Sequence, residues 1–195
     1  MKRAVPIFGL AAFALAGCVK FGEKPPPTLM VLSADAPRAA DTAGTGGQGT
    51  TLMVLPPEAP RMLATDRLVV RTSATTIAYL ENARWSDQPA KLFSDVLAET
   101  IAARTGRIVI DRRQYALSPG ARLTGRLNGF ELDTTRGEVV VNYDAAFAPG
   151  DGKPLLARRF EARLATPSEK PDAVARALNQ AANQVAVQVA DWIGK

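Results

Sequence analysis

The sequence predicts an α+β domain in which a mostly antiparallel or mixed sheet carries two principal helices on one face. Strand-like segments come in runs, with three in succession between residues 121 and 165, rather than in strict alternation with helices. That order favours α+β over a doubly wound parallel sheet. Two amphipathic segments, at 89–104 and 168–193, supply the helices. A chain of 195 residues has room for one domain with a substantial core and too little for two.

The first predicted strand has a near copy later in the chain. Thr28–Leu32 has the sequence TLMVL, and the same five residues return at Thr51–Leu55. Two copies are too few for a repeat architecture, so a local duplication, or chance in a low-complexity region, explains them better. Between them, residues 39–50 are rich in Gly, Thr and Ala and have little to bury, which predicts a flexible loop.

A hairpin is expected next. The β-branched run Arg67–Arg71 and the Thr- and Ile-rich run Thr75–Leu80 fit two antiparallel strands, and Ser73 and Ala74 fit a tight connection between them.

The first helix should begin with Ser86 or Asp87 as its N-cap and with Pro89 in its first turn. Gly106 stands just past its expected end, where a glycine commonly closes a helix. A short strand, Arg107–Ile110, follows.

Three predicted strands then form a meander: Ala121–Asp133, Glu138–Ala148 and Leu155–Ala165. Apolar residues occupy alternate positions in each, as expected for a sheet with one wet face. In the first of these strands the alternation places on one face Leu123, Gly125, Leu127 and Gly129. In the closing helix the apolar stripe recurs every three or four residues, and the predicted solvent face carries Arg176, Asn179, Gln180, Asn183, Gln184 and Gln188.

The N-terminus has the pattern of a bacterial secretion signal. Lys2 and Arg3 precede a short apolar run, Val5–Leu15, which is about half the roughly 20 residues that a membrane-spanning helix needs. The run ends in a sequence that resembles a lipobox: Leu15, Ala16, Gly17 and Cys18. We therefore predict a lipoprotein signal peptide at 1–17 and lipid attachment at Cys18, with an ordinary cleaved signal as the alternative.

Residues 18–27 are predicted to be a lipidated cysteine followed by a Pro-rich tether. Fatty chains such as palmitate on Cys18 would bind the protein to a membrane, because each buried CH₂ adds about 0.8 kcal/mol and two or three chains hold stably. A Pro-rich segment is extended at about 3.1 Å per residue, so the tether can lift the domain off the bilayer. Val19, the residue after the anchor, resembles the pattern of lipoproteins sorted to the outer membrane.

Composition excludes several kinds of chemistry. The chain has no histidine and one cysteine, which removes Ser-His-Asp triads, Cys-His dyads and the usual zinc and haem sites. Its acids are scattered singly, so we predict no catalytic residue, no metal site, no cofactor and no enzymatic activity. The formal charge of +5 is not concentrated in a Lys/Arg block, and nucleic-acid binding is not expected.

One aromatic segment has two interpretations. Tyr79 and Trp85 are six residues apart, just before the first helix. They fit core packing around the entry to that helix, which is the default. They also fit an aromatic-edged surface where a partner or a lipid docks.

Several motifs in this order resemble the ABC-type transport auxiliary lipoprotein components, the PqiC/YmbA-like lipoproteins. The carriers of the resemblance are the lipobox Leu15–Cys18, the strands Thr28–Leu32 and Arg67–Arg71, the segment Tyr79–Trp85, the helix positions Leu92–Ile101, the strand Gly125–Phe130 and a closing helix that ends near Trp192. The chain departs from the pattern at Thr28-Leu29, where many relatives have a Tyr pair, and in the insert between the two TLMVL copies.

The resemblance implies that residues 28–195 form the auxiliary lipoprotein domain, anchored through acylated Cys18 to the outer membrane and facing the periplasm. It implies a non-enzymatic docking component of an MCE-type ABC transport system for intermembrane lipid trafficking, with an MCE-domain protein as partner. Homo-oligomers are also implied, because relatives can form rings. The alternative is a structural or envelope-integrity lipoprotein without a transport partner.

Overall fold

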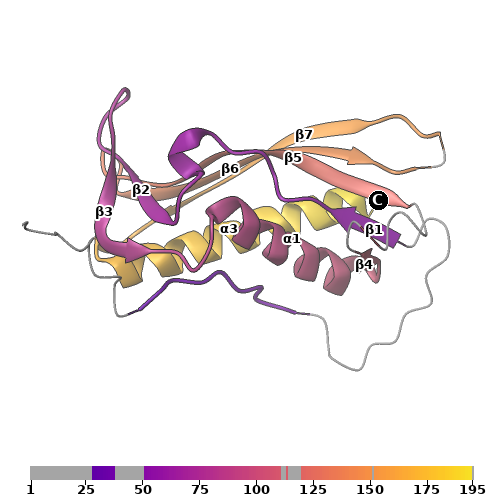
Figure 1. Cartoon of the computed structure of the whole chain (residues 1–195), viewed down its shortest axis with the longest axis horizontal. Coiled ribbons are helices and arrows are strands. Elements are labelled where there is room, and N and C mark those ends of the chain that lie inside the picture. Colours follow the sequence, from indigo (N-terminus) through magenta and orange to yellow (C-terminus); the bar gives the residue numbers. More distant parts are fainter. Residues whose placement is uncertain (1–27, 38–50, 111–112, 114–119, 151, 195) are drawn as a thin grey trace, which may run out of the picture.

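The protein folds as a mixed seven-stranded sheet with two long helices on one face, which confirms the predicted α+β class (Figure 1). The computed structural model describes residues 28–37, 51–110, 113, 120–150 and 152–194. In chain order the elements are β1 (Thr51–Val54), η1 (Arg61–Leu63), β2 (Arg67–Arg71), β3 (Ile77–Arg84), α1 (Pro89–Thr105), β4 (Ile108–Ile110), β5 (Ala121–Asp133), β6 (Glu138–Ala148), β7 (Leu156–Ala165) and α3 (Pro171–Ile193).

The predicted meander is confirmed and forms the largest part of the sheet. β6 pairs antiparallel with both β5 and β7 along nearly its whole length. The alternate residues of β6 are buried as predicted: Val139, Val141, Tyr143, Ala145 and Phe147. The alternation predicted for β5 is wrong in its second half. An irregularity between Leu127 and Gly129 shifts the register, so Phe130 and Leu132 continue the buried face in place of Gly129.

The other edge of β5 is covered by two separate strands. β1 runs parallel to its first residues, with Leu52 opposite Ala121, and β2 runs parallel to its last residues, with Val69 opposite Glu131. An isolated bridge from Glu58 to Arg126 lies between them. β4 extends this side by pairing with β1, and β3 does so by pairing with β2. The predicted hairpin is therefore confirmed, with its second strand reaching Arg84.

Helix α1 has nearly the predicted bounds but a different start. Gln88, rather than Ser86 or Asp87, is its N-cap and makes no side-chain capping bond. The Asp87 carboxylate instead accepts a hydrogen bond from the Gln88 backbone N–H and pairs with Lys91, both at 2.7 Å. Pro89 stands in the first turn, and Gly106 ends the helix in the left-handed conformation with φ of 69°, both as predicted.

Aromatic contacts place both helices on the same face of the sheet. Phe93 of α1 meets Tyr143 edge to face at 5.3 Å between ring centroids, and Trp192 of α3 meets Phe147 and Phe160 at 6.0 and 5.5 Å. Tyr143 and Phe147 are alternate residues of β6, so they share a face. No helix of the described residues is long and apolar enough to cross a bilayer.

The first described segment does not form the predicted strand. Thr28–Leu32 makes a single bridge, between Met30 and Trp85, whereas its copy at Thr51–Val54 is the buried strand β1. Residues 28–37, which we call the N-terminal strap, pass the helices on the side away from the sheet (Figure 1). The strap is fixed to α3 by amide side chains: Asn179 accepts from the Ser33 N–H at 2.9 Å, and Asn183 bonds both the strap and its own helix.

Gly125→Ala should destabilise the fold. A Cβ at this position would lie 2.1 Å from the Asp144 carbonyl oxygen and 2.6 Å from the Tyr143 ring, and both neighbours are fixed. The Tyr143 hydroxyl donates to the Thr124 carbonyl at 2.9 Å, so the ring cannot move aside without losing that bond. We expect a loss of about 1–3 kcal/mol in the free energy of unfolding, measured by urea denaturation. Gly129→Ala is the matched control, because its Cβ would meet nothing closer than 3.6 Å, and equal losses for both variants would contradict the argument.

Asn183→Ala should release the strap. Asn183 is 3% exposed; its amide nitrogen donates to the Ser33 carbonyl at 2.8 Å and its oxygen accepts from the Asp35 N–H at 2.9 Å. Removing it leaves both backbone groups without these partners, at a cost of about 1–3 kcal/mol. Urea unfolding and faster amide hydrogen exchange at Asp35 would report this. Gln184→Ala, an exposed neighbour on the same helix, should change neither measurement.

Candidate docking surface

A groove of about 520 Å³ runs between the N-terminal strap and α3. One wall comes from the strap and the other from the first half of the helix. The residues that line it are Thr28, Leu29, Met30, Val31, Ser33, Asp35, Asp172, Ala175, Arg176, Asn179 and Gln180. The groove therefore combines an apolar strip from the strap with polar side chains from the helix.

The strap presents two large apolar side chains to solvent. Leu29 is 53% exposed and Val31 is 62% exposed, while Met30 and Leu32, between and after them, pack against the core. This is the alternation of an extended chain with one face on the protein. Met30 and Leu32 hold the strap against the domain, and Leu29 and Val31 face solvent.

The helix side of the groove was only partly predictable. Asn179 and Asn183 were assigned to the solvent face of the closing helix, but both bond the strap backbone. The sequence did contain one indication of this contact. Asparagine is a poor helix former, and two asparagines four residues apart on one helix face suggest that their amides bind another segment. Asp172 and Arg176 lie farther along the groove, in the first turns of α3.

The face of the sheet opposite the helices carries a ladder of polar contacts. Arg159 bonds Asp144 through two nitrogens at 2.6 and 2.8 Å, and Asn128 bonds the same carboxylate at 2.7 Å. One step along the strands, Glu161 accepts from Asn142 at 2.7 Å and from Arg163 at 2.6 Å. Two depressions of about 270 and 360 Å³ lie over this ladder.

The electrostatics of the ladder keep its carboxylates ionised. The hydrogen bond from Arg159 lowers the pKa of Asp144, and the bond from Arg163 lowers the pKa of Glu161. A hydrogen bond from the Thr135 hydroxyl likewise lowers the pKa of Asp133. A paired carboxylate with a lowered pKa is a poor proton donor or acceptor near neutral pH, so these three side chains are charged there.

Glu131 is the buried member of this face. Its Oε1 pairs with Arg71 at 2.6 Å, while Oε2 has no hydrogen-bond partner among the described residues. Within those residues no group of three or more His, Cys, Asp or Glu side chains is placed to hold a metal ion.

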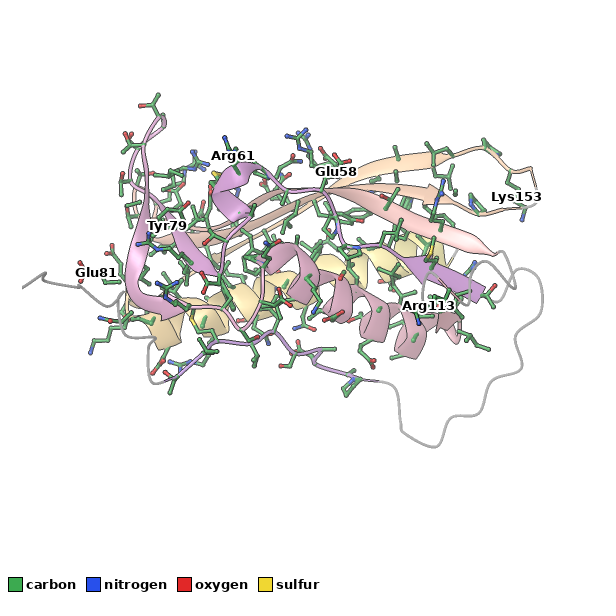
Figure 2. All side chains as sticks on the ribbon, viewed as in Figure 1. Glu58, Arg61, Tyr79, Glu81, Arg113 and Lys153 are labelled. Carbon is green, nitrogen blue, oxygen red and sulfur yellow. The ribbon has the colours of Figure 1, made fainter. Side chains whose placement is uncertain are left out.

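The structure separates Tyr79 from Trp85. Trp85 is 1% exposed and packs edge to face on Phe130 at 5.5 Å, so it belongs to the core and cannot face a partner or a lipid. Tyr79 is half-buried; its hydroxyl donates to the Met62 carbonyl at 3.4 Å, and the Arg67 guanidinium lies 4.3 Å from its ring centre. Figure 2 shows Tyr79 near Arg61, on the β3 side of η1. The core interpretation holds for Trp85, and the two rings form no common surface.

The other predicted features lie outside the described residues. These are the signal peptide at 1–17 with the lipobox Leu15–Cys18, the tether at 18–27 and the whole predicted loop at 39–50.

Comparison with known proteins places the chain in a family. No curated protein matches it significantly. Two crystal structures share its fold. One, of an uncharacterized protein, has 20% identity, a TM-score of 0.65, and coverage of 75% of this chain and 93% of that one. The other, of a DUF330 protein from Xanthomonas campestris, has 19% identity, a TM-score of 0.68, and coverage of 86% and 95%.

A PelC dodecamer from Paraburkholderia phytofirmans is much more distant. It has 11% identity, a TM-score of 0.41, and coverage of 75% of this chain and 91% of that one.

The family model for the ABC-type transport auxiliary lipoprotein component matches residues 31–190. That match begins within the strap and ends in the last turn of α3, so it includes every strand of the described residues, α1, and α3 up to residue 190. The chain therefore belongs to the ABC-type transport auxiliary lipoprotein component family.

Proposed function

We propose that this protein is anchored through acylated Cys18 to the periplasmic side of the outer membrane. There it acts as a non-enzymatic docking component of an MCE-type ABC transport system that moves lipids between membranes. The observation that carries the proposal is the family match over residues 31–190, which supports a transport auxiliary role. The lipobox directly upstream supports the anchor, and Val19 supports the outer-membrane address.

The arrangement of the domain agrees with a docking role. Asp144 and Glu161 are paired with arginines across the open sheet face, and the strap exposes two large apolar residues, Leu29 and Val31. Such surfaces recognise other molecules without transforming them. The partners we propose are the membrane itself, an MCE-domain protein, and further copies of this chain.

The anchor can be tested on the native protein. Cys18→Ser should abolish acylation and move the protein from the membrane to the soluble periplasmic fraction, because no fatty chain is left to hold it. Mass spectrometry of the N-terminal peptide and membrane fractionation measure this. The domain should keep its unfolding transition, since residues 28–194 contain the whole described fold. A wild-type protein with an unmodified Cys18 would overturn the proposed anchor.

The proposed localisation to the outer membrane can be tested separately from the anchor. Val19→Asp should leave Cys18 acylated but shift the protein from outer-membrane to inner-membrane fractions, because an Asp after the anchor resembles the inner-membrane retention pattern. An unchanged distribution in a sucrose gradient would argue against sorting through this position.

The partner can be tested by capture of the lipidated protein from native membranes after mild detergent extraction. We expect an MCE-domain protein to copurify with the wild type and to be much depleted with Cys18→Ser. Capture of cell-wall or outer-membrane assembly proteins alone would favour the alternative, an envelope-integrity lipoprotein with no transport partner. Sedimentation of the same preparation would report self-assembly.

A further inference from the structure

We propose that the exposed edge of the N-terminal strap is a membrane-contact surface, in which Leu29 and Val31 insert into the bilayer to which the protein is anchored. The inference rests on the proposed acylation of Cys18 and specifies which face of the domain meets the lipid. It would fix the orientation of the domain, which an acyl anchor on a tether does not do.

The first argument is the exposure of the two side chains. Leu29 and Val31 are more than half exposed, while Met30 between them packs on the core. The strap is fixed at Met30, which bonds Arg84 and Ser86 through its backbone, and at Ser33, which bonds Asn179 and Asn183. Val31 lies between these two fixed points, and Leu29 directly precedes the first of them, so the backbone holds both side chains outward. Turning them inward would break these bonds.

The second argument is their place in the chain. Thr28 comes ten positions after Cys18, so along the chain the start of the strap cannot lie farther than about 35 Å from the lipidated residue. A contact of two side chains is too weak to recruit a free protein to a bilayer. When the protein is already anchored, the tether keeps the strap near the bilayer at a high effective concentration. A contact that is weak by itself is then formed for much of the time. No other large exposed apolar residue in the described segments comes so soon after the anchor.

The third argument concerns charge. The groove beside the strap is lined by Asp35 and Asp172 together with Arg176, so it offers no excess of basic groups to anionic headgroups. The contact is therefore apolar. We expect it to persist at high salt, whereas a basic patch would release.

The test places a fluorophore on the strap of the full, acylated chain. Val31→Cys is labelled with the environment-sensitive dye NBD through a maleimide, and the protein is reconstituted into phosphatidylethanolamine/phosphatidylglycerol vesicles. In a lipobox protein the cysteine sulfur carries a diacylglycerol through a thioether, which does not react with a maleimide, so the added thiol is the labelling site. We expect a blue shift of emission on reconstitution, and quenching by lipids that carry a doxyl group in the acyl chain. Both signals should survive high salt.

Leu155→Cys is the matched control, because Leu155 is 63% exposed against 62% for Val31. It lies near Lys153 at the end of the β6–β7 hairpin, away from the strap (Figure 2). A label there should keep the emission of an aqueous site. No shift at position 31, or equal shifts at both positions, would overturn the proposal.

A second variant tests whether a change in the fluorescence signal comes from loss of the membrane contact or from loss of folding. Leu29→Glu in the Val31→Cys background should reduce the blue shift while leaving the thermal unfolding transition intact, because Leu29 already faces solvent. An undiminished shift would count against insertion of the strap. Mass spectrometry of the same preparation shows whether Cys18 is acylated, so the proposed anchor and the proposed strap contact can be judged separately. Acylation without a shift would refute the contact alone, and an unmodified Cys18 would refute the anchor.

Discussion

The position of α3 between the sheet and the strap is the constraint on which the rest of the structure depends. Its apolar stripe, from Val174 to Val189, is fully buried against the sheet side, and Trp192 closes the last turn over Phe147 and Phe160. Its other side holds the strap through Asn179 and Asn183. Since both helices cover one face of the sheet, the opposite face is left to water, and its polar ladder follows from that exposure.

The regular part of this fold was predictable because local pattern and tertiary environment agree. The bounds of β5 and β6 follow from period-two alternation and turn residues, and α3 follows from its helical stripe. The identical TLMVL segments show where local pattern fails. At Thr51–Val54 the chain lies between β4 and β5 and becomes a strand, while at Thr28–Leu32 it lies on helix surfaces and makes one bridge. Because the two segments have the same sequence, the difference in their pairing must come from the rest of the chain.

The candidate surface was less predictable than the fold, for a related reason. From the sequence, Trp85 and Tyr79 could lie on a surface or in the core. In the structure only Trp85 is fully buried, and β3 between them is irregular, with φ of 55° at Asn82. The Asn183 amide was assigned to solvent because the helical pattern identifies a polar face without showing what covers it. The covering segment comes from about 150 residues earlier in the chain. The helical spacing of apolar residues gives no information about contacts with so distant a segment.

The two faces of the domain differ in chemistry. On the sheet face, arginine side chains form intramolecular pairs with carboxylates, such as Arg159 with Asp144. On the strap face the unpaired feature is apolar, and it directly follows the segment that joins the domain to Cys18. A domain oriented by the strap would turn its sheet face away from the lipid. That face would then be the one left open to a protein partner.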